Sequence, residues 1–134
     1  MTDTDLWTDE GVAPGGTVGG DGAGESISRR FHQQLADGTY VAVESYWYPV
    51  NIGERFGEDR EDAGMYDVEN MTCVTVCTDI EDPGMSEISS EYTYDFPSYT
   101  SFPTEADAIA YSEQQAKNDD PGNYGDPKHW GITV

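Results

Sequence analysis

The sequence predicts an α+β protein, in which one helix from the C-terminal half packs on a small antiparallel sheet of three to four strands; it also allows a short N-terminal helix. Nine Tyr and nine Val against only two Leu favour strands over a helix bundle. Only one segment, near residues 104–118, is rich in Ala. At 134 residues the chain has the length of one domain.

Residues 1–25 predict a flexible, acidic, glycine-rich arm, and residues 26–134 a single α+β domain. Seven glycines crowd positions 11–24, and such a segment buries too little surface to offset its ordering entropy. Leu6 and Trp7 stand out at its start. They are either stray apolar residues of a tail or an anchor that docks on a partner, and we expect the anchor.

A short helix is predicted over residues 26–37. Ile27, Phe31 and Leu35 recur every four residues and would form one apolar stripe. Ser26 or Ser28 can cap its start, and Gly38 can end it.

Three strands are predicted over residues 39–50, 66–80 and 86–96. Pro49 ends the first strand, and the other two form a hairpin around residues 82–84, where Pro fixes φ and Gly supplies a positive φ. The third strand alternates most regularly, with Tyr92 and Tyr94 on one face and Glu91 and Asp95 on the other. Alternating apolar residues at 130, 132 and 134 allow a short terminal strand.

The C-terminal helix is predicted to begin after Thr104, which can cap it, and to run to about residue 118. Its expected contact face is narrow, with Ile109 as the only large apolar residue.

The formal net charge of -21 makes nucleic acid and anionic membranes poor partners. No nucleophile elbow, phosphate loop, dinucleotide fingerprint or zinc pair occurs, so we expect no enzyme activity, no cofactor and no metal site. Cys73 and Cys77, four residues apart on a strand, would be too far apart for a disulfide. We therefore expect a non-catalytic protein that binds a protein partner or builds a homo-oligomeric assembly.

One explanation of the charge is adaptation to molar salt. The composition, with 27 acidic residues and two Lys, resembles that of cytoplasmic and virus proteins of salt-in haloarchaea. Molar salt shortens the Debye length to about 3 Å and removes most self-repulsion. The resemblance implies a high-salt source. Together with the predicted arm and the lack of a catalytic motif, it leads us to expect a small accessory or virion component that docks through Leu6 and Trp7.

The alternative is mimicry of nucleic acid. Carboxylates at alternate strand positions lie about 6.6 Å apart, close to the spacing of phosphates along a DNA strand. Six residues on neighbouring strands could form such a patch: Asp67, Glu69, Asp79, Glu87, Glu91 and Asp95. In this respect the chain resembles small acidic phage proteins that inhibit restriction or CRISPR proteins. The same residues can also be the solvated face of a sheet.

No run of 18 apolar residues occurs, and residues 1–10 lack the basic and apolar regions of a secretory signal. We therefore expect the protein in the cytoplasm or in a virion.

Overall fold

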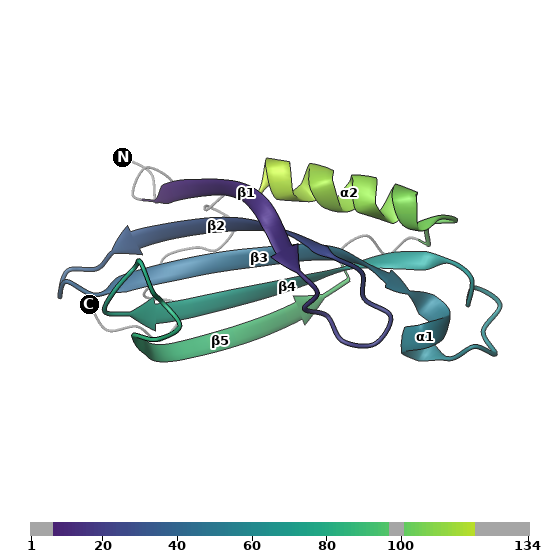
Figure 1. Ribbon diagram of the computed structural model, residues 1–134, viewed down its shortest axis with the longest axis horizontal. Helices are drawn as coiled ribbons and strands as arrows, with labels where there is room; N and C mark the ends of the chain where they lie inside the picture. The colour runs from purple at the N-terminus through teal and green to yellow at the C-terminus, as the bar shows by residue number, and fades with distance from the viewer. Residues whose placement is uncertain (1–6, 97–100, 120–134) are drawn as a thin grey trace.

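Five antiparallel strands pair in the order in which they occur along the chain, and a helix lies across one face of the sheet (Figure 1). The computed structural model describes residues 7–96 and 101–119. The elements are β1 (Thr8–Gly16), β2 (Ser26–Gln34), β3 (Tyr40–Asn51), α1 (Ile52–Phe56), β4 (Tyr66–Cys77), β5 (Glu87–Asp95) and α2 (Glu105–Asn118). The antiparallel sheet with one packed helix is the predicted α+β architecture.

Three of the strands and the C-terminal helix occupy the predicted segments, but the sheet has five strands and not three to four. Two strands, β1 and β2, occur where an arm and a helix were expected. The predicted terminal strand at residues 130–134 lies outside the described residues.

The flexible arm predicted for residues 1–25 is wrong for residues 8–16, which form β1 and pair with β2. Asp9 and Glu10 form ion pairs with Arg29 and Arg30 of β2. The hydrogen bond from Arg29 holds the pKa of the Asp9 carboxyl below its usual value.

Gly15 lies against β2 and β3, because an added Cβ would be 2.4 Å from Ser26 Oγ. Close packing therefore requires glycine there.

The short helix predicted over residues 26–37 is wrong, because residues 26–34 form β2. A spacing of four residues is about one turn of a helix but also two pleats of a strand. Phe31 and Leu35, which suggested the helical stripe, are buried on the same face of the sheet. The polar residues Arg29 and Gln33, at the alternate positions on either side of Phe31, share that face.

Helix α2 begins as predicted, because the Thr104 hydroxyl accepts a hydrogen bond from the backbone N–H of Asp107. Its contact face differs from the expected one. The buried residues are Ala108, Ser112 and Ala116, whereas Ile109 is only half-buried. These small side chains lie one turn apart, so the helix backbone approaches the sheet closely.

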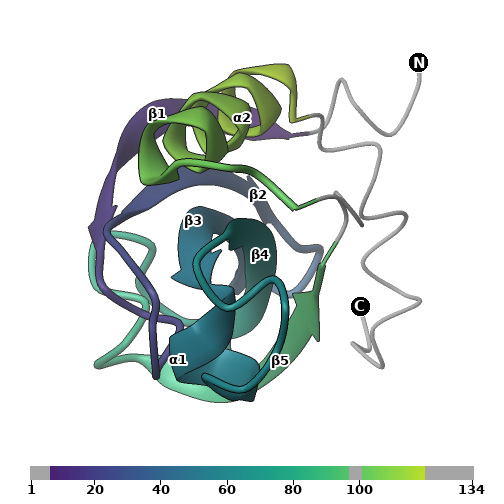
Figure 2. The ribbon, with the colours of Figure 1, turned by 90° about the vertical axis from the view of Figure 1, so that its right-hand side faces the viewer.

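The sheet has two faces, which Figure 2 shows end-on. On the helix face, which faces α2, Trp47 and Val68 pack with Ala108 and Ala116, while Val41 and Val43 pack with Trp7 and Phe31. On the opposite face, here called the loop face, Tyr48, Val50 and Met71 pack with Val18 and Ala23 of the β1–β2 loop. The sheet therefore has apolar clusters on both sides.

Candidate functional site

Of the two predicted anchor residues, the structure describes only Trp7, which is buried. Trp7 is only 8% exposed and packs with Phe31, Leu35 and Val76 in the protein's own core. Leu6 lies outside the described residues. Trp7 therefore contributes to the hydrophobic core of the domain.

The six carboxylates predicted to mimic phosphates do not lie together. Register places Asp67 and Glu69 on the loop face with Val50 and Tyr48, whereas Glu91 and Asp95 lie on the helix face opposite Val74 and Asn70. Asp79 belongs to the β4–β5 turn and accepts a hydrogen bond from the backbone N–H of Glu81. Glu87 is separated from Ser89 by a β-bulge at Ile88. Carboxylates thus occur on both faces and at the end of the sheet.

Glu69 is a structural residue, because it is 4% exposed and accepts hydrogen bonds from two partners. The Tyr48 hydroxyl donates to it at 2.7 Å, and Arg55 Nη1 donates to both its oxygens at 3.1 and 3.2 Å. Arg55 also donates to the carbonyls of Gly19 and Asp21. Burial, and then the hydrogen bond to Glu69, raise the pKa of Tyr48. This network fastens the β1–β2 loop and α1 to the sheet.

Every arginine in the sequence makes an ion pair with a carboxylate of the same chain. The pairs are Arg29–Asp9, Arg30–Glu10, Arg55–Glu69 and Arg60–Asp62. The guanidinium groups therefore stabilise the fold, and they neutralise only a few of the 27 acidic side chains. Most of the acidic side chains therefore have no arginine partner within the chain.

Strand β5 is the most exposed element of the sheet. All nine of its residues are exposed, and among the described residues only β4 pairs with it. Tyr92 and Tyr94 lie on the loop face, each 56% exposed, opposite Cys73 and Met71 of β4. The four residues on the helix face of β5 are Ser89, Glu91, Thr93 and Asp95. These side chains and the outer backbone edge of β5 are here called the β5 surface.

The other edge strand, β1, is irregular. Its register shifts at two points, between Asp9 and Gly11 and between Pro14 and Gly16. Bulges and proline are features that prevent an edge strand from pairing further. By contrast, β5 has no proline, and its one bulge lies near its start. The two edges therefore differ in how readily they could accept another strand.

Hydrogen bonding favours the neutral form of two tyrosines on the loop face. The hydrogen bond with Cys73 is the first cause that raises the pKa of Tyr92. Burial, followed by the hydrogen bond to Glu44, raises the pKa of Tyr46. At neutral pH these side chains present uncharged aromatic rings beside an acidic surface.

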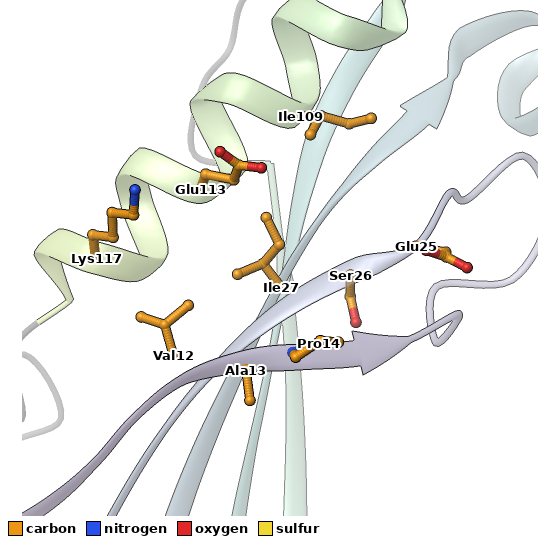
Figure 3. Close-up of a pocket in the computed structure, with 9 residues that line it drawn as sticks. All are labelled: Val12, Ala13, Pro14, Glu25, Ser26, Ile27, Ile109, Glu113 and Lys117. Carbon is orange, nitrogen blue, oxygen red and sulfur yellow. The ribbon is translucent and has the colours of Figure 1, made fainter.

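A concave feature lies between α2 and the β1–β2 edge of the sheet. It is an open cavity of about 530 Å³ (Figure 3). Val12 and Ile27 approach it from the sheet, and Glu113 and Lys117 from α2. Its lining includes neither histidine nor cysteine, and Ser26, its one hydroxyl residue, donates its hydrogen bond to the Gly16 carbonyl.

Within residues 7–96 and 101–119, no three His, Cys, Asp or Glu side chains are grouped so that they could hold a metal ion. In the same part of the chain, no helix combines the length and apolar character that crossing a bilayer requires.

Sequence reasoning placed residues 89–95 of β5 on the correct faces, but it put Glu87 on the wrong face, because the bulge at Ile88 pairs Glu87 with Cys77 on the loop face. It also missed that β5 is an edge strand of the sheet. The order of the strands decides which of them lie at the edges. The strand that was missed, β1, forms the opposite edge of the sheet from β5. A sequence signal for β1 was present, because the acidic pair at residues 9–10 matches the basic pair at residues 29–30.

Comparisons with protein-family models, with curated proteins and with solved structures give no match.

Proposed function

We propose that this protein is a non-catalytic interaction protein that binds a basic protein partner through the β5 surface. The observation that carries the proposal is the full exposure of a nine-residue edge strand that presents tyrosines on one face and carboxylates on the other. Exposed aromatic residues are enriched at protein interfaces, and exposed strand edges are ready templates for pairing with another chain.

The proposal moves the binding surface away from the N-terminal arm. Trp7 is part of the core, and β1 is held in the sheet by the ion pairs of Arg29 and Arg30. An anchor function would require pulling this segment out of the sheet, whereas the β5 surface needs no rearrangement.

Two origins of the acidity are compatible with the proposal, and the distribution of carboxylates favours adaptation to molar salt. A solubility function predicts exposed acids on every face, which is the pattern of Asp79, Glu87 and Glu91. In this interpretation the protein is a small accessory or virion component from a high-salt host. Mimicry of nucleic acid, the alternative, favours a patch on one face.

Affinity capture from an extract of the source cells tests the proposal. The bait is the full chain, compared with a variant that carries Tyr92→Ser and Tyr94→Ser and with a control that carries Asp59→Asn and Glu61→Gln. Asp59 and Glu61 are exposed residues of the α1–β4 loop. We expect the wild type and the control to retain a basic protein that the tyrosine variant loses.

Retention of the same proteins by all three baits, or of no basic protein, would contradict the proposal. Addition of duplex DNA to the loaded bait separates the two origins of the acidity. Release by DNA indicates that the partner's nucleic-acid site is occupied and supports mimicry, whereas continued retention favours the accessory protein.

A further inference from the structure

We propose that β5 accepts an extended basic segment of the partner as a sixth strand of the sheet, and that this segment alternates Lys or Arg with apolar residues. The inference rests on the proposed function and specifies the chemistry of its partner. Three features of the β5 surface carry it: the backbone edge, the charge of one face and the aromatic character of the other.

The backbone edge of β5 determines how a partner strand would pair with it. In an antiparallel strand, residues alternate between pairing with one neighbour and pointing their N–H and C=O groups the opposite way. With β4 on one side, the alternate groups of β5 point away from the sheet, and among the described residues no strand pairs with them. Nine residues span about 30 Å, enough for a partner strand of similar length.

The helix face of β5 sets the charge of the partner. Glu91 and Asp95 lie on this face with the neutral residues Ser89 and Thr93 between and beside them. Neither carboxylate makes an ion pair with a described basic residue, since the four arginines pair elsewhere. Directly opposed side chains of neighbouring strands lie about 5 Å apart, so Lys or Arg on an added strand would reach both acids.

The loop face of β5 explains why the partner segment should alternate basic with apolar residues. Tyr92 and Tyr94 expose more than half of their surface on this side, next to the partly buried ring of Phe96. An added strand would place every second side chain against these rings, where apolar and β-branched residues pack favourably. A segment that is basic at every position would leave the rings uncovered, so alternation is the expected pattern.

A second copy of this chain fits the same edge poorly. Glu91 is the central residue of β5, so full antiparallel pairing of two copies would oppose Glu91 with itself. Like charges directly opposite each other destabilise a strand pair. Net charges of -21 on each copy add a long-range repulsion.

High salt does not remove the attraction of the proposed pairing. Screening acts mainly on solvent-exposed charges, and ion pairs that become partly buried under an added strand are screened much less. The same segment can therefore bind in dilute buffer and in brine.

Fluorescence anisotropy with synthetic peptides tests the inference on the full chain. The probes have the nine-residue length of β5. One alternates Lys and Val, and its isomer of identical composition has all Lys residues in one block. We expect the alternating peptide to bind about tenfold more tightly than the block isomer, because only alternation satisfies both faces of the added strand.

Matched variants locate the site. Glu91→Gln with Asp95→Asn should weaken binding of the alternating peptide about fivefold, since two cross-strand ion pairs are lost. Tyr92→Ser with Tyr94→Ser should weaken it by a similar factor. The control, Asp59→Asn with Glu61→Gln, removes the same charge away from β5 and should leave the affinity within about twofold.

Equal affinity for the two peptide isomers, or an equal loss in the control variant, would overturn the inference and indicate general attraction of a polycation. Dimerisation of the free chain that the alternating peptide does not disrupt would assign the edge to a second copy and would also overturn it. If capture of a basic partner still depends on Tyr92 and Tyr94 while the isomers bind equally, the proposed function stands and strand addition fails. If capture does not depend on Tyr92 and Tyr94 and the two isomers bind equally, the proposed function and the strand addition both fail.

Discussion

Arg29 joins three elements through one guanidinium group. Its Nε and Nη2 atoms donate to Asp9 of β1, and its Nη1 donates to the carbonyls of Ala116 and Lys117 at the C-terminal end of α2. Carbonyls at this end of a helix have no partner within the helix and carry partial negative charge. A planar cation with several donors is therefore suited to hold β1, β2 and α2 together.

Replacing Arg29 with Lys should destabilise the protein by about 2 kcal/mol, because Lys retains the charge but cannot donate in both directions at once. The free energy of unfolding measured with urea checks this value. Arg60→Lys is the matched control, since Arg60 pairs with Asp62 inside an exposed loop and its change should stay within about 0.5 kcal/mol. Equal effects of the two substitutions would show that Arg29 does not link these elements.

At the scale of elements, α2 lies on the sheet through small side chains. Ala108 and Ala116 are fully buried and pack with Trp47 and Val68. Since α2 contributes fully buried alanines directly against Trp47 and Val68, the contact tolerates little added volume at these two positions.

Replacing Ala108 with Leu should destabilise the protein by about 2 kcal/mol, because the larger side chain forces α2 away from Trp47. Ala110→Leu on the exposed side of the same helix should change the stability by less than about 0.5 kcal/mol. Thermal unfolding of both variants checks the comparison. A tolerated Ala108→Leu would contradict the close packing of the helix.

The elements that the sequence predicted correctly are those with one dominant local pattern. Alternation with β-branched and aromatic residues marked β3 and β5, and Thr104 marked the start of α2. Strand β2 was missed because its apolar spacing fits a helix and a strand equally. Strand β1 was missed because its pairing depends on ion pairs with residues about 20 positions away.

The predicted acidic patch failed for a reason of register. Side chains alternate between faces, so a shift of one residue between neighbouring strands moves an entire set to the opposite side. Glu69 and Glu91 were expected together, but the pairing of Cys73 with Tyr92 places them on opposite faces. The sequence of a single strand does not specify which of its residues share a face with given residues of the neighbouring strand.

At the scale of the whole molecule, the fold neutralises little of its own charge. The four arginines pair with carboxylates of the same chain, and the 27 acidic residues exceed the six Lys and Arg by 21, which gives the net charge of -21. Self-repulsion of this size opposes the compact state. Salt or a basic partner should relieve it.

The free energy of unfolding should therefore rise between about 0.1 M and about 1 M KCl, as the Debye length falls from about 10 Å to about 3 Å. Denaturation followed by circular dichroism at several KCl concentrations measures the change. A variant with Asp59→Asn, Glu61→Gln, Glu91→Gln and Asp95→Asn is the control and should respond less steeply. A stability that does not depend on salt in either protein would contradict the argument from self-repulsion.

Hydrogen–deuterium exchange of the full chain, with and without the alternating Lys–Val peptide, tests most directly whether β5 is the binding surface. We predict slower exchange at alternate amides of residues 87–95 when the peptide is bound, and unchanged exchange in β1 and around the cavity beside α2. Protection centred on β1 or on the cavity, or no protection in β5 when the peptide is bound, would contradict the account.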